Sequence, residues 1–130
     1  MNKPCNYMTP EQRFRLDEAC RVFEESFDFG VYLVGSVMSR PDFRDVDVRA
    51  IVADETFARL YPRADPKNPM RDAYWALVMA ALSLYLRVAT GLPIDFQVQQ
   101  QTAANEEFPG VRSALGLGHV SRARHLEAPR

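Results

Sequence analysis

The chain has 130 residues, which is enough for one domain with a modest core and too few for two. Apolar residues make up 47% and charged residues 25%, as in a water-soluble globular protein, and the net charge of −1 excludes a strongly basic nucleic-acid binder. Cys5 and Cys20 are too few for a disulfide framework or a zinc site, so we expect free thiols in a reducing cytoplasm. The polar, proline-bearing N-terminus is unlike a signal peptide.

The first predicted element is an amphipathic helix over residues 9–28. Thr9 is suited to the N-cap, Pro10 to the first helical position, and Gln12 can reach back to the cap amide. Apolar residues then recur at helical spacing, and Gly30 ends the segment. This pattern predicts a helix that covers one face of the fold.

Two strands are expected next. Residues 31–34 form a short apolar run that Gly35 and Ser36 stop, and residues 37–44 include turn-forming residues. Residues 45–52 then alternate between apolar and charged positions, which is the period of a strand with one buried face.

A short helix over 54–61 is followed by the longest apolar element of the chain. Asn68 is the expected cap of this second helix, Pro69 its first residue, and Gly91 its end. The helix has so little polar surface that we expect it to be buried on more than one side. Its longest apolar run, residues 73–82, is too short for a membrane span.

Residues 93–99 alternate again and predict a third strand. We therefore expect a core over residues 1–100, with residues 101–130 as an irregular C-terminal extension of the same domain. His119 and His125 fall in that extension, where we expect them to be exposed rather than metal ligands.

Connection lengths predict how the strands pair. About ten residues join the first two strands, and since a parallel crossover needs roughly a dozen or more, this pair should be antiparallel. The second connection is long and contains a helix, so strands two and three can run parallel. The prediction is an α/β fold (a mixed α+β sheet) in the order helix-strand-turn-strand-helix-strand, with the helices on one face. Ser36, Asp45, Asp47 and Asp95 should then meet at one end of the sheet.

A cluster of carboxylates needs a compensating positive charge or a proton. Asp45 and Asp47 stand two apart on a strand, and unit charges about 4–5 Å apart repel by several kcal/mol at an effective dielectric near 20. Oxygen ligands with open positions suit Mg²⁺, with Mn²⁺ as the alternative, and no histidine adjoins the cluster to favour zinc.

Gly35-Ser36, a spacer, Asp45-Val-Asp47-Val and a later strand Asp95 resemble the DNA polymerase β-type nucleotidyltransferase superfamily, most closely its small single-domain members. The resemblance extends from the first helix to the strand that ends near Gln99. The small mixed sheet of that superfamily agrees with the predicted topology.

The resemblance implies a role for each of these residues. Gly35 would let the backbone approach phosphate, and Ser36 would hydrogen-bond the terminal phosphates. Asp45 and Asp47 would hold the magnesium bound to the triphosphate. Asp95 would complete a second metal position and help to deprotonate the acceptor hydroxyl. Without the resemblance, a strand-ending turn and a solvated strand edge are the alternatives.

The spacer departs from the superfamily pattern, because Arg44 stands where a serine is usual and the segment is short and broken by proline. Arg44, Arg49 and Arg40 are candidates for phosphate contacts, with ordinary surface arginines as the alternative. We expect no helical second domain, of the kind that larger members carry, within these 130 residues.

The function implied by the resemblance is Mg²⁺-dependent transfer of a nucleoside monophosphate from a nucleoside triphosphate to a hydroxyl of a protein, an RNA end or a small molecule. The alternative is a module of this fold that binds nucleotide or a protein partner without turnover, as an antitoxin does. A third possibility is a structural domain with surface carboxylates. We expect a cytoplasmic protein without membrane contact, which pairs with a second copy or with a helical partner protein.

Overall fold

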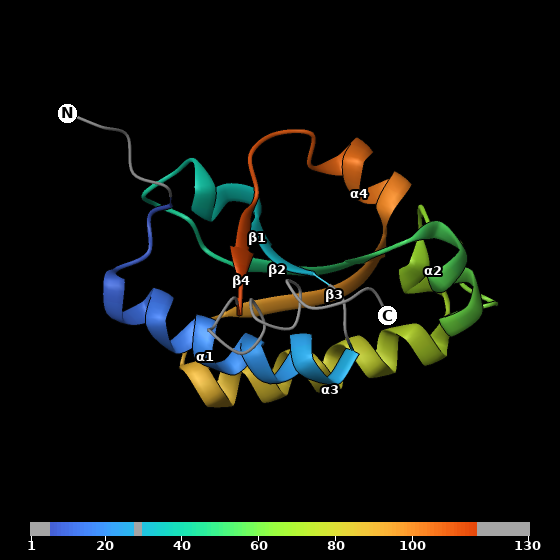
Figure 1. Cartoon of the computed structure of the whole chain (residues 1–130), viewed down its shortest axis with the longest axis horizontal. Coiled ribbons are helices and arrows are strands. Elements are labelled where there is room, and N and C mark those ends of the chain that lie inside the picture. Colours follow the sequence, from blue (N-terminus) through green and yellow to red (C-terminus); the bar gives the residue numbers. More distant parts are fainter. Residues whose placement is uncertain (1–5, 28–29, 117–130) are drawn as a thin grey trace, which may run out of the picture.

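The computed structural model describes residues 6–27 and 30–116. Within them, four strands form one mixed sheet in the order β3-β2-β1-β4 (Figure 1). The strands are β1 (Val31–Val34), β2 (Val46–Val52), β3 (Ile94–Gln100) and β4 (Ser113–Leu115). The α-helices are α1 (Pro10–Phe27), α2 (Asp54–Leu60), α3 (Ala73–Thr90) and α4 (Gln101–Glu107), and two short 3-10 turns are η1 (Gly35–Met38) and η2 (Pro69–Arg71).

The strand directions are as predicted from the connection lengths. β1 pairs with β2 in antiparallel fashion, and β2 pairs with β3 in parallel. The mixed α/β class is therefore confirmed. The parallel pair is reached through α2, η2 and α3, which supply the length that a crossover requires.

α1 begins with the predicted capping box. The Gln12 backbone amide donates to Thr9 Oγ1 at 3.1 Å, and the Thr9 amide donates to Gln12 Oε1 at 2.9 Å. α1 and α3 lie together on one face of the sheet (Figure 1). There Phe23 of α1 packs edge-to-face on Phe96 of β3, with ring centroids 5.0 Å apart, so the core lies between these helices and the apolar side of the strands.

α3 begins later than the sequence suggested. Pro69 starts the separate turn η2, and Asp72 is the N-cap of α3, with its carboxylate accepting a hydrogen bond from the Trp75 amide at 2.9 Å. Asn68 makes no side-chain cap. Asp72 has extended backbone dihedrals, which separate the two turns. The predicted end is confirmed, because Gly91 adopts the left-handed conformation with φ of +72°.

One side of α3 is tied to the free edge of β3 by hydrogen bonds. The Ser83 hydroxyl accepts from the Phe96 amide at 2.9 Å, and the Arg87 Nε donates to the Ile94 carbonyl at 2.8 Å. The Trp75 indole donates to the Val98 carbonyl at 3.2 Å. These side chains satisfy backbone groups that an edge strand would otherwise leave open, and they fix the rotation of α3.

The expectation that α3 is buried on more than one side is wrong. By length and composition α3 could span a membrane, with a mean hydropathy of 1.4, yet only 28% of it is buried. Its inner side packs on the sheet, whereas Leu77 is 69% exposed and Val88 is 80% exposed. The apolar composition therefore reflects both a core side and an apolar outer side.

Residues 101–116 are more regular than expected. α4 follows β3 directly, and β4 pairs antiparallel with β1, so the described sheet has a fourth strand that the predicted order lacked. Arg13 of α1 donates to the Ser113 hydroxyl at 2.8 Å and to the Ala114 carbonyl at 2.7 Å, which holds β4 in place. α4, which was not predicted, lies on the opposite side of the sheet from α1 and α3, so the helices of the described fold do not all share one face (Figure 1).

Candidate functional site

The predicted carboxylates meet at one end of the sheet. Asp47 and Asp95 are direct partners in the parallel register of β2 and β3, and Asp45 immediately precedes β2. Val34, the last residue of β1, is the antiparallel partner of Asp47, so Gly35 and Ser36 follow at the same end. We call Asp45, Asp47 and Asp95 the acidic end of the sheet.

Gly35 is in direct contact with Asp47. Its φ of +79° lies in the left-handed region, which favours glycine. A Cβ at this position would collide with the Asp47 carboxylate oxygen Oδ2. Glycine therefore suits this position in two ways, because it permits the turn into η1 and leaves room for the Asp47 carboxylate in its present orientation.

Arg49 lies between two of the three carboxylates. Its Nη2 is 3.5 Å from Asp95 Oδ2 and 3.9 Å from Asp47 Oδ1, and its Nη1 donates to the Asp95 carbonyl at 2.8 Å. The side chain is only 5% exposed, and its guanidinium carbon stands 5.5 Å from the centre of the Phe108 ring. A guanidinium of the chain itself thus supplies part of the positive charge that the carboxylates require.

Arg49 does not fully compensate Asp47. Burial raises the pKa of the Asp47 carboxyl, the nearby Arg49 lowers it, and the charges of Asp95, Asp45 and Glu107 raise it again. The net direction is upward, so the surroundings disfavour the ionised form. A further cation at this position would be favourable.

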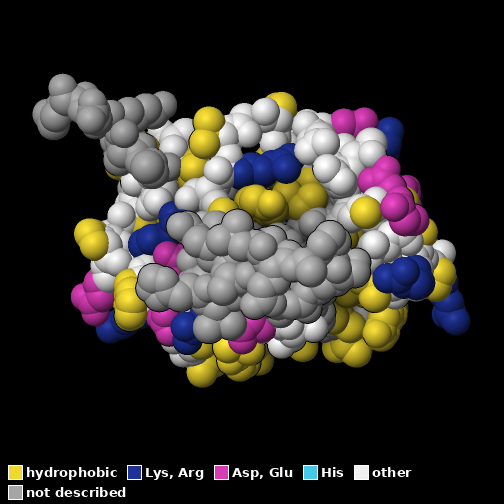
Figure 2. Space-filling model, in the orientation of Figure 1, with side chains coloured by type: hydrophobic (Ala, Val, Ile, Leu, Met, Phe, Trp, Pro, Cys, Tyr) yellow, Lys and Arg dark blue, Asp and Glu magenta, His cyan; other side chains and the backbone are white. Residues whose placement is uncertain are grey.

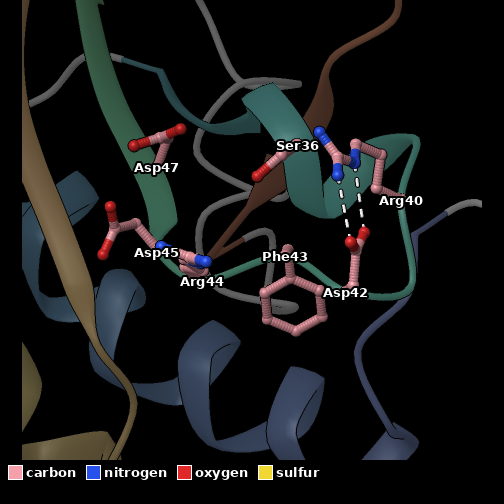
Figure 3. Close-up of a pocket in the computed structure, with 7 residues that line it drawn as sticks. All are labelled: Ser36, Arg40, Asp42, Phe43, Arg44, Asp45 and Asp47. Carbon is pink, nitrogen blue, oxygen red and sulfur yellow. Dashed lines mark hydrogen bonds and ion pairs between the residues drawn. The ribbon is translucent and has the colours of Figure 1, made fainter.

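A pocket of about 340 Å³ opens beside Asp47. Figure 3 shows the Ser36 hydroxyl on one side of this hollow and Asp47 on the other, whereas the Asp45 carboxylate points away from Ser36. The pocket is lined by residues from η1, from the following loop and from the start of β2: Ser36, Arg40, Asp42, Phe43, Arg44, Asp45 and Asp47. Its size is in the lower part of the range found for small-molecule sites.

The three candidate arginines differ in their availability. Arg40 makes two hydrogen bonds to Asp42, at 3.0 and 3.1 Å, and this pairing lowers the pKa of Asp42 (Figure 3). Arg49 is buried against Asp95. Arg44 lines the pocket, is exposed, and makes no hydrogen bond or ion pair within residues 6–27 and 30–116. Arg44 is therefore the arginine best placed to receive an anion.

The acidic end does not form a ready-made three-carboxylate metal site. Among the residues that the structure describes, no three acidic, histidine or cysteine side chains are arranged to hold a metal ion together. Asp95 does not line the pocket that Asp45 and Asp47 share. His119 and His125 lie outside the described residues.

Two features of the site were not predicted from the sequence. Period-2 spacing puts Arg49 on the same face of β2 as Asp47, which was a usable signal for an internal ion pair. The placement of Glu107 and Phe108 near Asp47 and Arg49 had no such signal, because it depends on α4 turning back over the polar face of the sheet.

The chain matches no protein-family model, no curated protein and no solved structure.

Proposed function

We propose that the acidic end of the sheet binds a magnesium–nucleoside triphosphate complex and transfers the nucleoside monophosphate to a hydroxyl acceptor. The observation that carries this proposal is the register of β2 and β3. It sets Asp47 beside Asp95 at the end of the sheet where Gly35 and Ser36 complete β1. The same arrangement is what the resemblance to the polymerase β-type nucleotidyltransferases implies.

The donor set fits one divalent cation better than two. Asp45 and Asp47 both line an open pocket and offer hard carboxylate oxygens, which suit a hydrated Mg²⁺ that also takes phosphate oxygens. When bound, magnesium would neutralise charge on the triphosphate. Between Asp47 and Asp95, the guanidinium of Arg49 already lies within 4 Å of both carboxylates. We therefore assign no second metal position there.

The remaining pocket residues supply contacts for the phosphates. Ser36 can donate its hydroxyl to a phosphate oxygen, and Gly35 carries no side chain that would displace Asp47 from the pocket. Arg44 can pair with phosphate without first breaking another ion pair. Arg40 would have to release Asp42 before it could do so.

In the proposed reaction, the acceptor oxygen forms a bond to the α-phosphorus while the bond to the bridging oxygen breaks and pyrophosphate leaves. The hydroxyl proton passes to the Asp95 carboxylate, which is 43% exposed and therefore open to a substrate. Arg49 is a positioning residue in this scheme, since it holds Asp95 through both the carboxylate and the backbone carbonyl.

A second function, binding of nucleotide without transfer, is favoured by the same ion pair. The Asp95 carboxylate already has a cationic partner within the chain, because the buried Arg49 guanidinium lies 3.5 Å from it and takes the place that a metal ion would occupy. In that case the chain would act through the bound nucleotide or through a protein partner.

Titration calorimetry with magnesium and each nucleoside triphosphate tests binding. We expect magnesium-dependent heat for the wild type, none for Asp47→Asn, and wild-type heat for Asp65→Asn, which is an exposed turn residue remote from the pocket. If the wild type binds no triphosphate, both proposed functions are wrong, and the carboxylates of the acidic end belong to a structural domain without a nucleotide site.

Incubation with a triphosphate labelled on its α-phosphate, together with host lysate, separates the two functions. Transfer predicts a labelled acceptor and released pyrophosphate, both of which Asp95→Asn should abolish while triphosphate binding persists. Triphosphate binding without a labelled acceptor or released pyrophosphate would support the second function, binding without transfer.

A further inference from the structure

The outer face of α3 is a continuous apolar surface. We define it by its exposed residues Tyr74, Leu77, Ala81, Leu84 and Val88. Hydrophobic side chains gather along the lower edge of Figure 2, where α3 runs in Figure 1. The sequence of α3 contains one charged residue, Arg87, whose Nε is bound to the backbone of β3.

This face cannot be buried by a rotation of α3 within the same chain. Trp75, Ser83 and Arg87 hydrogen-bond the edge of β3, and turning the helix would break all of these bonds together. Contiguous apolar surface that a fold is obliged to present to solvent marks an interaction site.

The spacing along the outer face is that of a helix–helix seam. Its five residues are separated by three, four, three and four positions, the repeat with which side chains of one helix enter the gaps of another. Side-chain size along this face is nearly symmetric about Ala81, because Leu77 lies four residues before it and Leu84 three residues after it. Tyr74 and Val88 then stand at the two ends.

An interface between two identical copies requires a surface that is complementary to itself, and a nearly symmetric order of side chains along the helix meets this requirement. Antiparallel packing about a two-fold axis at Ala81 sets Leu77 of each copy against Leu84 of the other. The small central side chain lets the two helices approach closely. The face carries no acidic residue and presents no cluster of basic residues, so it lacks the charges that would select an oppositely charged protein or anionic lipid.

The exposed area is sufficient for a modest dimer. Leu77, Leu84 and Val88 are 60–80% exposed, Tyr74 is 62% exposed, and Tyr85, which borders the outer face, is 49% exposed. Side chains of roughly 150–200 Å² exposed to this degree present on the order of 500–600 Å² per copy, against about 800 Å² per partner in a standard interface. We propose that the outer face of α3 is the interface of a homodimer with antiparallel α3 helices.

Sedimentation equilibrium of the full chain tests this proposal. We expect the wild type to approach twice its monomer mass of 14.8 kDa in the micromolar range. Leu77→Glu and Leu84→Lys should each weaken the dimer at least tenfold, because each buries a charge in the seam. Val111→Glu is the matched control, since Val111 is 82% exposed but lies outside α3, and it should dimerise as the wild type does.

Mixing the two variants tests the direction of packing. Leu77→Glu and Leu84→Lys should form a mixed dimer, because the antiparallel seam sets the new carboxylate against the new ammonium. Asp47→Asn should dimerise normally, so a failed dimer and a failed nucleotide site are distinguishable. A monomeric wild type over the whole range, mixed variants that do not associate, or a monomer that binds neutral or anionic vesicles through these leucines would overturn the proposal.

Discussion

At the scale of single residues, Asp47 connects the parts of the candidate site. It touches Gly35, lies 3.9 Å from the Arg49 guanidinium, and is the register partner of Asp95. Its raised pKa shows that these neighbours, taken together with burial, disfavour the negative charge. The folded chain thus maintains an unfavourable carboxylate, as binding sites commonly do before their ligand arrives.

The difference in stability between Asp47→Asn and the wild type should therefore depend on pH. Because the pKa is higher in the folded than in the unfolded state, ionisation of Asp47 lowers the free energy of unfolding as pH rises from the ordinary aspartate range, near 3.9, through the raised value. An asparagine side chain does not ionise, so the variant does not lose this part of the free energy of unfolding. Urea unfolding should show the variant to be more stable than the wild type at pH 7, with the difference shrinking toward pH 4. A variant that is less stable at pH 7 would mean that the attraction to Arg49 dominates.

At the scale of elements, α3 has two different sides, one that packs on the sheet and one that forms an exposed apolar surface. Its inner side hydrogen-bonds the edge of β3, and its outer side is apolar and exposed. Helical periodicity alone does not reveal this division, because both sides are apolar. The residues that mark the inner side are the few polar ones, Ser83 among them, whose hydroxyl both accepts from and donates to Phe96 of β3.

The start of α3 can be tested by removing its cap. Asp72→Ala should lower the free energy of unfolding by about 1 kcal/mol, the usual cost of losing an N-cap side chain. Asn68→Ala should change it little, because Asn68 caps neither η2 nor α3. Urea denaturation of both variants measures the difference. A larger loss for Asn68→Ala would support the helix start expected from the sequence.

At the scale of the whole molecule, the sheet brings together segments that are far apart in the chain. β4 closes on β1, which lies about eighty residues earlier in the chain, and α4 carries Glu107 and Phe108 over the polar face that holds Arg49. A ligand at the acidic end would therefore contact strands whose pairing spans most of the described fold.

Magnesium with a bound triphosphate should accordingly stabilise the whole fold against unfolding. A ligand at one hundred times its dissociation constant adds about 2.7 kcal/mol, which corresponds to a rise of roughly 10 °C in Tm for a domain of this size. Differential scanning calorimetry measures the shift, with Asp47→Asn as the variant that should not respond. An equal rise in Asp47→Asn would assign the effect to ions bound elsewhere on the protein.

The sequence by itself determined α1, α2, the end of α3 and the three strands β1, β2 and β3 with their pairing, because these follow from local rules. The capping box at Thr9, the left-handed Gly91, the period-2 strands and the lengths of the connections predicted the sheet that joins Asp47 to Asp95. Only the tertiary structure decided what surrounds them. Three features depend on contacts between distant segments: Arg49 reaches Asp95 and Phe108, β4 adds an edge strand, and one side of α3 stays exposed. The energies of such contacts are set by packing in three dimensions, which no local pattern encodes.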